Sequence, residues 1–209
     1  MVKKIVGVAV IGFMVCIQAM TAQAQDSASD SIERLLEMNR NIEGEFRQVT
    51  YDEKGKQLQA SEGVFLLAKP NQFVWDSVTP FSQRIISDGN YITVWDVDLE
   101  QATKKPLSGA IGNSPAALLG RPAAEVLPHY TVAILGQEKF RLQPKEDQEL
   151  FQALTLSFRD EVISAMSIVD ALGQTTVIEF KNVETHDGVA KENFVLDLPA
   201  NVDVIVEGQ

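Results

Sequence analysis

The sequence predicts a mainly β fold with helices: one strongly curved antiparallel sheet, an incomplete β-barrel of roughly eleven strands, with helices closing its open side. Three observations support this prediction. Polar and apolar residues alternate, with a period of two, in runs that begin near residue 45. Turn signals divide the chain into short segments at regular spacing. The number of these segments is too large for a flat open sheet, so the sheet is expected to curl.

The first expected element is an amphipathic helix over Ser27–Asn41, in which Ile32, Leu35 and Leu36 have helical spacing and after which Gly44 provides a stop. Residues 99–106 are mostly polar and are not counted as a strand. The expected strands are 45–51, 57–68, 72–76, 82–87, 91–97, 130–135, 139–144, 150–159, 162–170, 175–183, 194–198 and 202–206.

The central stretch is Phe65–Asp76, where two short apolar runs flank a Lys-Pro-Asn turn. Proline disfavours a helical conformation at the lysine before it, and asparagine is a good turn residue, so two strands joined by a tight corner are predicted. Alternation along the second strand places Phe73 and Trp75 on one face. The preceding strand, 57–68, is apolar on both faces in its second half. Either it is covered on both sides or one of its faces lines a cavity.

The N-terminus has the pattern of a signal peptide, in which Lys3 and Lys4 precede an apolar stretch that ends in Ala22-Gln23-Ala24. We expect residues 1–24 to be cleaved and residues 25–209 to form a single domain. The only cysteine, Cys16, would be removed with the leader, and its neighbours do not match a lipid-anchor site. The expected product is exported, soluble and free of cysteine chemistry.

The net charge of the chain is −11 at pH 7. Such an acidic protein repels phosphate backbones and anionic lipid surfaces at long range, which argues against nucleic acid as a partner. Contact with a lipid should therefore involve a ligand held inside the protein, and not adsorption to a membrane surface. A simpler role for the charge is solubility.

Catalytic motifs are absent from the sequence. His129 and His186 fall in expected loops far apart in the chain, and no nucleophile elbow, phosphate-binding glycine loop or zinc motif is present. The acidic stretch Asp96–Glu100 lacks the turn and the distant glutamate of a calcium loop, so a solvated strand end is favoured over a cation site. Ser114 is better explained as a helix cap than as a nucleophile. We expect neither enzymatic activity nor a cofactor or metal.

A short apolar helix is expected over Ser114–Gly120, with Pro115 at its first position and Gly120 as its stop. The loop before it is rich in glycine, alanine and serine. A segment with so few polar or long-range contacts could move as a lid. The alternative is a connecting helix that packs permanently on the sheet.

The strand, the Lys-Pro-Asn turn and the Phe-x-Trp pair are followed by Ser87-Asp88-Gly89, Glu100-Gln101-Ala102-Thr103 and Gly112-Asn113-Ser114-Pro115. In this order the motifs resemble the LolA family of periplasmic lipoprotein carriers, and the resemblance covers nearly the whole chain after the leader. It implies a half-barrel with a helical lid over an apolar cavity. It also implies acylated lipoproteins as ligands, an inner-membrane exporter of the LolCDE type, an outer-membrane receptor of the LolB type, and a monomer in the periplasm.

The resemblance implies two groups of site residues and one latch. The cavity would be lined by Phe46, Phe65, Phe73, Trp75, Ile92 and Val94, and the lid would contain Pro115, Ala116, Leu118 and Leu119. Lys69 stands where the family usually has an arginine that holds the lid shut. We expect its charged side chain to contact carbonyls near Asn113–Leu119 through fewer hydrogen bonds than arginine would make. The alternatives are that Phe73 is ordinary core and that Lys69 points to solvent.

Two other functions remain open at this point. A sensor or regulatory interaction module of the periplasm could use the same half-barrel fold and the same apolar concavity, although such regulators carry an additional domain. A secreted hydrolase is disfavoured because the sequence shows no triad. Binding of acylated compared with unacylated lipoprotein would separate these functions from a carrier.

Overall fold

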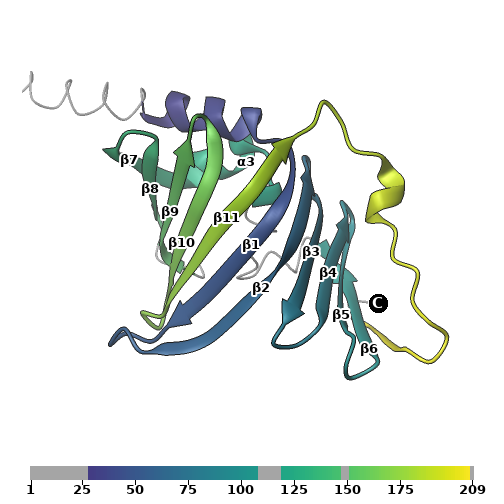
Figure 1. The fold of residues 1–209 in the computed structure, drawn as a ribbon. Coiled ribbons are helices and arrows are strands. Elements are labelled where there is room, and N and C mark those ends of the chain that lie inside the picture. The colour runs from purple at the N-terminus through teal and green to yellow at the C-terminus, as the bar shows by residue number, and fades with distance from the viewer. Residues whose placement is uncertain (1–27, 108–118, 147–150, 208–209) are drawn as a thin grey trace, which may run out of the picture.

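The computed structural model of the chain describes residues 28–107, 119–146 and 151–207, and these form one twelve-stranded sheet that curves strongly on itself (Figure 1). The sheet order is β12-β6-β5-β4-β3-β2-β1-β11-β10-β9-β8-β7. The strands are β1 Asn41–Tyr51, β2 Gln57–Ala68, β3 Gln72–Thr79, β4 Gln83–Asp88, β5 Tyr91–Asp96, β6 Gln101–Pro106, β7 Tyr130–Gly136, β8 Lys139–Pro144, β9 Phe151–Arg159, β10 Val162–Asp170, β11 Thr175–Thr185 and β12 Asp203–Val206.

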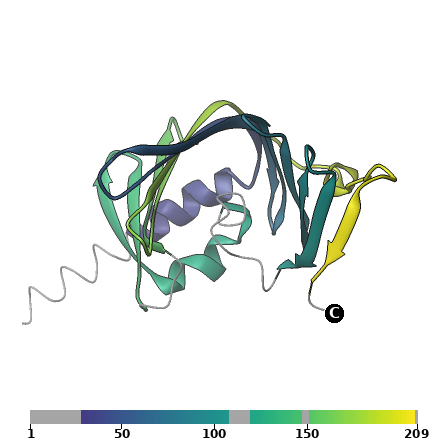
Figure 2. The same cartoon turned by 90° about the horizontal axis from the view of Figure 1, so that it is seen from below.

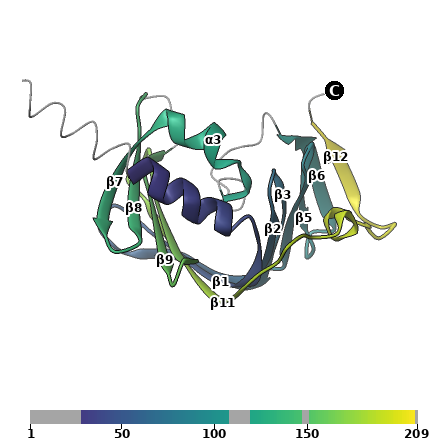
Figure 3. The same cartoon turned by 90° about the horizontal axis from the view of Figure 1, so that it is seen from above.

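Neighbouring strands are antiparallel except for β12, which pairs in parallel with β6. The pairing of β1 with β11 joins the first and last long strands and places β1 and β11 at the middle of the curve (Figure 3). The first described helix, residues 28–38, and helix α3, Ala123–Val126, lie inside the curve on the concave face (Figures 2 and 3). The expected curved, mainly antiparallel sheet with helices on its open side is thus confirmed.

The hydrophobic core lies between these helices and the concave face. Ile32 and Leu35 are buried on the helix, and they belong to the same cluster as Phe65 and Phe73 from the sheet. Burial of apolar surface at roughly 25 cal/mol per Å² makes this contact the main source of stability for the helical layer. On the far side of the same cluster, Met166 of β10 is fully buried.

Three expectations about the elements were wrong. The strand β6 was missed because most of its residues are polar. Only one of its six residues is buried, since the strand lies near the edge of the sheet. Residues 194–198 are not a strand; the chain forms the short 3-10 helix Lys191–Phe194 and then runs without regular structure. The first helix ends at residue 38 and β1 begins at Asn41, so Gly44 lies within a strand.

Gly44 has a packing role in place of the expected helix stop. A β-carbon at this position would lie 2.9 Å from the carbonyl oxygen of Lys181 and 3.2 Å from the ring of Phe65. The register between β1 and β11 shifts beside it, between Glu43 and Glu45. Glycine is therefore required by the close approach of these strands.

Asn39 ends the first helix and fixes it to the sheet. Its side-chain Nδ2 donates to the carbonyl oxygens of Leu35 and Glu161, both at 2.8 Å, and its Oδ1 accepts from the backbone N–H of Ile163 at 3.0 Å. Arg34 forms an exposed ion pair with the Glu161 carboxylate at 2.7 Å. The helix is thus attached to the turn between β9 and β10.

The C-terminal segment crosses the convex face of the sheet after β11 (Figure 1). Phe194 is buried there, and it lines a groove together with Thr93 of β5. Beyond it, β12 adds to the edge of the sheet beside β6. None of the helices described in the structure has the length and apolarity needed to cross a membrane. The expected leader, residues 1–24, lies outside the described residues.

Candidate functional site

Four aromatic side chains form a cluster on the concave face, under the helices. The rings of Phe46 and Trp75 stack with their centroids 4.0 Å apart, and the Phe65 ring lies 5.8 Å from Trp75. Phe180 of β11 contacts Phe65 and Trp75 edge-on. Three members of this aromatic cluster were expected from the sequence. Phe180 was missed, because it joins Phe46 only through the pairing of strands that are far apart in the chain.

The other expected cavity residues occupy two different environments. Phe73 has an exposed fraction of 0% and Ile92 is also buried in the core cluster. Val94 is only partly buried, and it lies two residues after Ile92 on the same face of β5. The structure therefore places Phe73 in closed core, whereas Val94 lies nearer to the open part of the concave face.

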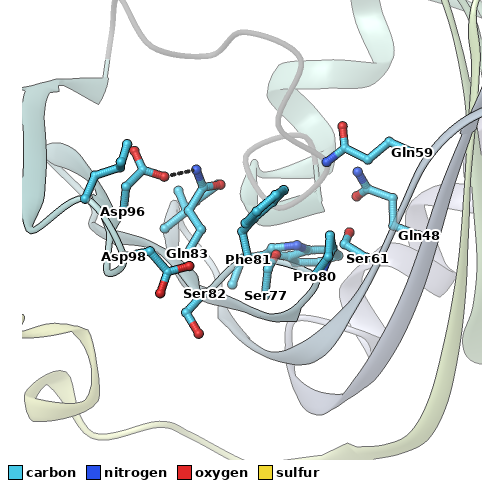
Figure 4. A pocket seen from close by; sticks show the side chains of 13 residues that line it. Gln48, Gln59, Ser61, Ser77, Pro80, Phe81, Ser82, Gln83, Asp96 and Asp98 are labelled. Atoms are coloured by element: carbon cyan, nitrogen blue, oxygen red, sulfur yellow. Dashed lines mark hydrogen bonds between the residues drawn. The ribbon is translucent and has the colours of Figure 1, made fainter.

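A cavity of about 630 Å³ opens on the concave face next to Trp75 (Figure 4). Its volume is in the usual range for small-molecule sites. Its apolar part is formed by Trp75 and Ile85 on the sheet and by a rim of three loop residues, Pro80, Phe81 and Leu99. Its polar lining residues are Gln48, Gln59, Ser61, Ser77, Ser82, Gln83, Asp96 and Asp98.

The Lys-Pro-Asn turn joins the sheet to both helical segments. The Lys69 Nζ donates to the carbonyl oxygen of Leu36 at 2.8 Å, and the Lys69 backbone N–H donates to the carbonyl oxygen of Arg40 at 2.9 Å. Two residues later, the backbone N–H of Asn71 donates to the carbonyl oxygen of Gly120 at 2.8 Å. The turn therefore holds the C-terminal ends of the first helix and of the segment that precedes α3.

Burial lowers the pKa of Lys69 to about 8, although the nearby carboxylate of Glu37 raises it in part. Desolvation disfavours the charged form of an amine, and one hydrogen bond to a carbonyl compensates only partly. Lys69 thus points to the first helix and not to solvent. Residues 113–118, which it was expected to contact, lie outside the described residues.

The relatives of the chain agree on one family. The family profile described as "Outer membrane lipoprotein carrier protein LolA" matches residues 37–197. The chain belongs to the LolA family. Proteins named "Outer-membrane lipoprotein carrier protein" are similar over nearly their full length. The one from Pseudomonas fluorescens strain Pf0-1 is 34% identical, with 93% of this chain and 96% of the relative covered. The one from Alcanivorax borkumensis is 35% identical, with 89% and 91% covered.

A solved structure with a similar fold is that of an uncharacterized conserved protein from Thermus thermophilus. It has a TM-score of 0.54 at 9% sequence identity, with 87% of this chain and 99% of that chain covered. At this identity the likeness shows the fold alone. The profile and the relatives therefore confirm the predicted family, and the solved structure supports the fold alone.

The lid expected for a LolA protein lies mostly outside the described residues, since Pro115, Ala116 and Leu118 are not described. Leu119 is described and is buried in the core cluster. Next to it, a β-carbon on Gly120 would lie 3.4 Å from the Phe73 ring. The C-terminal end of the expected lid thus packs directly on the closed core beside the Lys-Pro-Asn turn.

The polar half of the cavity was not predicted from the sequence. Three of its residues, Gln48, Gln59 and Ser61, lie on β1 and β2. The alternation of residues along a strand shows which side chains share a face, but it does not show what that face contacts. The rim residue Phe81 was missed because it lies between strands. A large aromatic side chain directly after a proline in an exposed loop was the available signal.

The candidate ionic residues do not form a metal site in the described part of this LolA protein, where no three His, Cys, Asp or Glu side chains are grouped closely enough to hold an ion. Asp96 accepts a hydrogen bond from the Gln83 side chain at 2.6 Å. The His186 Nε2 lies 3.2 Å from a carboxylate oxygen of Glu43 on the convex side of the sheet.

Proposed function

We propose that this LolA protein carries lipoproteins through the periplasm by holding their acyl chains on the concave face of its sheet. It receives them from an inner-membrane exporter of the LolCDE type and passes them, as a monomer, to an outer-membrane receptor of the LolB type. The observation that carries the proposal is the 630 Å³ cavity, which continues the buried aromatic cluster outward through Trp75. Acyl chains bind there by exclusion of water, with a gain of about 0.8 kcal/mol for each buried methylene. No catalytic step is required.

The described arrangement corresponds to a closed carrier. Phe46, Phe65, Phe73 and Ile92 are buried under the helical layer, so these side chains become accessible to acyl chains only when that layer moves. In our proposal Trp75, which lines the open cavity, and Val94, which is partly buried on the same face, bind first. The lid residues Pro115, Ala116, Leu118 and Leu119 then give way as more of each chain enters. The closed state competes with the ligand, which allows release at the receptor.

We propose that Lys69 contributes to closure as the latch of the lid. Its turn holds Leu36 by the side chain and Gly120 by the backbone of Asn71. Loss of the amine should therefore loosen both helical segments. Hydrogen exchange of the Gly112–Gly120 amides in wild type, Lys69→Ala and Lys69→Arg tests this role. Equal exchange rates in all three proteins would mean that Lys69 is not a latch.

The carrier function is tested by competition for a fluorescent fatty-acid probe. A triacylated lipoprotein should displace the probe, whereas the same protein without its acyl chains should not. Phe81→Asp and Leu99→Asp should weaken the displacement, because each places a charge at the apolar rim. Leu172→Asp is the matched control, since Leu172 is exposed in the turn between β10 and β11. Equal displacement by both forms of the lipoprotein would overturn the proposal.

A further inference from the structure

The cavity combines an apolar floor with a polar lining of one electrostatic sign. Among the thirteen described residues that line it, Asp96 and Asp98 are acidic and none is a lysine or an arginine (Figure 4). The remaining polar groups are side-chain amides and hydroxyls. Figure 4 shows the two carboxylates on one side of Phe81 and Gln48 with Gln59 on the other. The cavity therefore offers neutral hydrogen-bond donors but no positive charge.

The basic side chain next to the lining residue Gln83 faces the other way. A second basic residue, Lys105 of β6, pairs with Ile92 and so shares the concave face, but it is not among the described residues that line the cavity. Arg84 follows Gln83 on β4, and its guanidinium donates two hydrogen bonds of 2.6 Å to the Asp76 carboxylate. Both residues alternate with the cavity residues Trp75 and Ile85, so they lie on the convex face. Arg84 is thus committed to a bidentate ion pair and cannot serve an anion in the cavity.

Ser61 supplies a separate indication of a polar ligand group. Its exposed fraction is 9%, and it lines the cavity. A hydroxyl in the cavity wall can donate its proton to an ester or amide carbonyl of a ligand. Gln48 and Gln59 lie beside it and can donate to the same type of group (Figure 4).

We infer that the cavity selects lipids by the charge of their polar end: it accepts the uncharged glyceryl ester and amide groups of an acylated protein and rejects the anionic headgroup of a phospholipid. This inference rests on the proposed carrier function. Phospholipid and lipoprotein have similar acyl chains, so the apolar floor cannot distinguish them. Asp96 and Asp98 can, because a phosphate near two carboxylates is repelled and finds no lysine or arginine among the described lining residues to neutralise it.

The selection is tested by transfer of a pyrene-labelled diacylglycerol, or of phosphatidylglycerol with the same two chains, from neutral phosphatidylcholine vesicles to the protein. Wild type should take up about ten times more diacylglycerol than phosphatidylglycerol. This is the size of effect that a few charges produce at short range in a partly desolvated site. Asp96→Asn/Asp98→Asn should raise the uptake of phosphatidylglycerol relative to that of diacylglycerol, so that the preference falls toward one.

The matched control is Asp197→Asn/Asp203→Asn, which changes the net charge equally at exposed positions outside the cavity. This control should leave both uptakes unchanged. The inference is overturned if wild type takes up both lipids equally, or if the control raises phosphatidylglycerol uptake as much as the cavity variant does. Uptake of neither lipid would instead contradict the carrier function itself. Should the cavity variant fail to fold, the wild-type preference measured from about 0.01 M to about 1 M salt decides, because screening must reduce it.

Discussion

The two ends of the concave face differ although the same strands build them. At the helix-covered end, Phe46 and Phe65 are buried in the aromatic cluster. Two residues further along β1 lies Gln48, and four residues back along β2 lies Ser61, both in the lining of the open cavity. Trp75 belongs to both ends. One strand face therefore changes from buried core to cavity lining within one or two steps of its period.

The difference follows from what covers each end. The helix of residues 28–38 is fixed over the aromatic end by Asn39 on one side and by Lys69 on the other. Among the described residues, the open end is bordered by the rim residues Pro80, Phe81 and Leu99, of which Phe81 and Leu99 are largely exposed. The covered end should therefore determine stability, and the open end should determine ligand binding.

The strongest test of this division is Phe73→Ala. Phe73 is fully buried at the covered end, and truncation should lower the free energy of unfolding by about 3 to 5 kcal/mol through lost burial and the cavity left behind. Urea denaturation measures the effect. The control at the open end is Ser77→Ala, which removes only a cavity-lining hydroxyl and should change stability by less than about 0.5 kcal/mol. A similar loss in both variants would contradict the division.

A smaller loss is expected for Asn39→Ala, which leaves the carbonyl of Glu161 and the N–H of Ile163 without their side-chain partner. Unsatisfied buried groups of this kind should lower the free energy of unfolding by about 1 to 3 kcal/mol. Arg34→Ala removes the neighbouring exposed ion pair and should cost less than about 1 kcal/mol. If the Arg34 variant were the less stable of the two, Asn39 would not be the main attachment of the helix.

The attachment through Lys69 should depend on pH. Its folded-state pKa is about 8, below the ordinary lysine value of 10.5. Between these values the unfolded chain binds the proton and the folded chain does not, so wild-type stability rises with pH in this window. Relative to Lys69→Met, the gain should be about 2 to 3 kcal/mol between pH 8 and 10.5. Lys69→Arg does not titrate there and should show no such rise. A constant difference between wild type and Lys69→Met would exclude a desolvated amine.

Much of the covered end could be predicted from the sequence, and little of the open end could. The placement of Phe73 and Trp75 on one strand face follows from the alternation along the strand and from the Lys-Pro-Asn turn, whose residues favour a tight corner. Phe180 could not be placed beside Phe46, because local patterns do not reveal which distant strands pair. The partner of Lys69 was also beyond the pattern, since its carbonyl lies on a helix from another part of the chain. Polar cavity residues such as Gln48 resemble ordinary solvent-facing positions.

The smallest effect on stability is expected for Phe81→Ala at the open rim. Phe81 has an exposed fraction of 71%, so its truncation should change the free energy of unfolding by less than about 0.5 kcal/mol. Its ring nevertheless borders the cavity and would be covered by a bound acyl chain, so affinity for an uncharged acyl probe should fall by roughly fivefold to tenfold. Urea denaturation and probe titration on the same sample separate the two quantities. Loss of stability with unchanged affinity would place Phe81 in the core and not at a ligand surface, and the contrast between the two ends of the sheet would be lost.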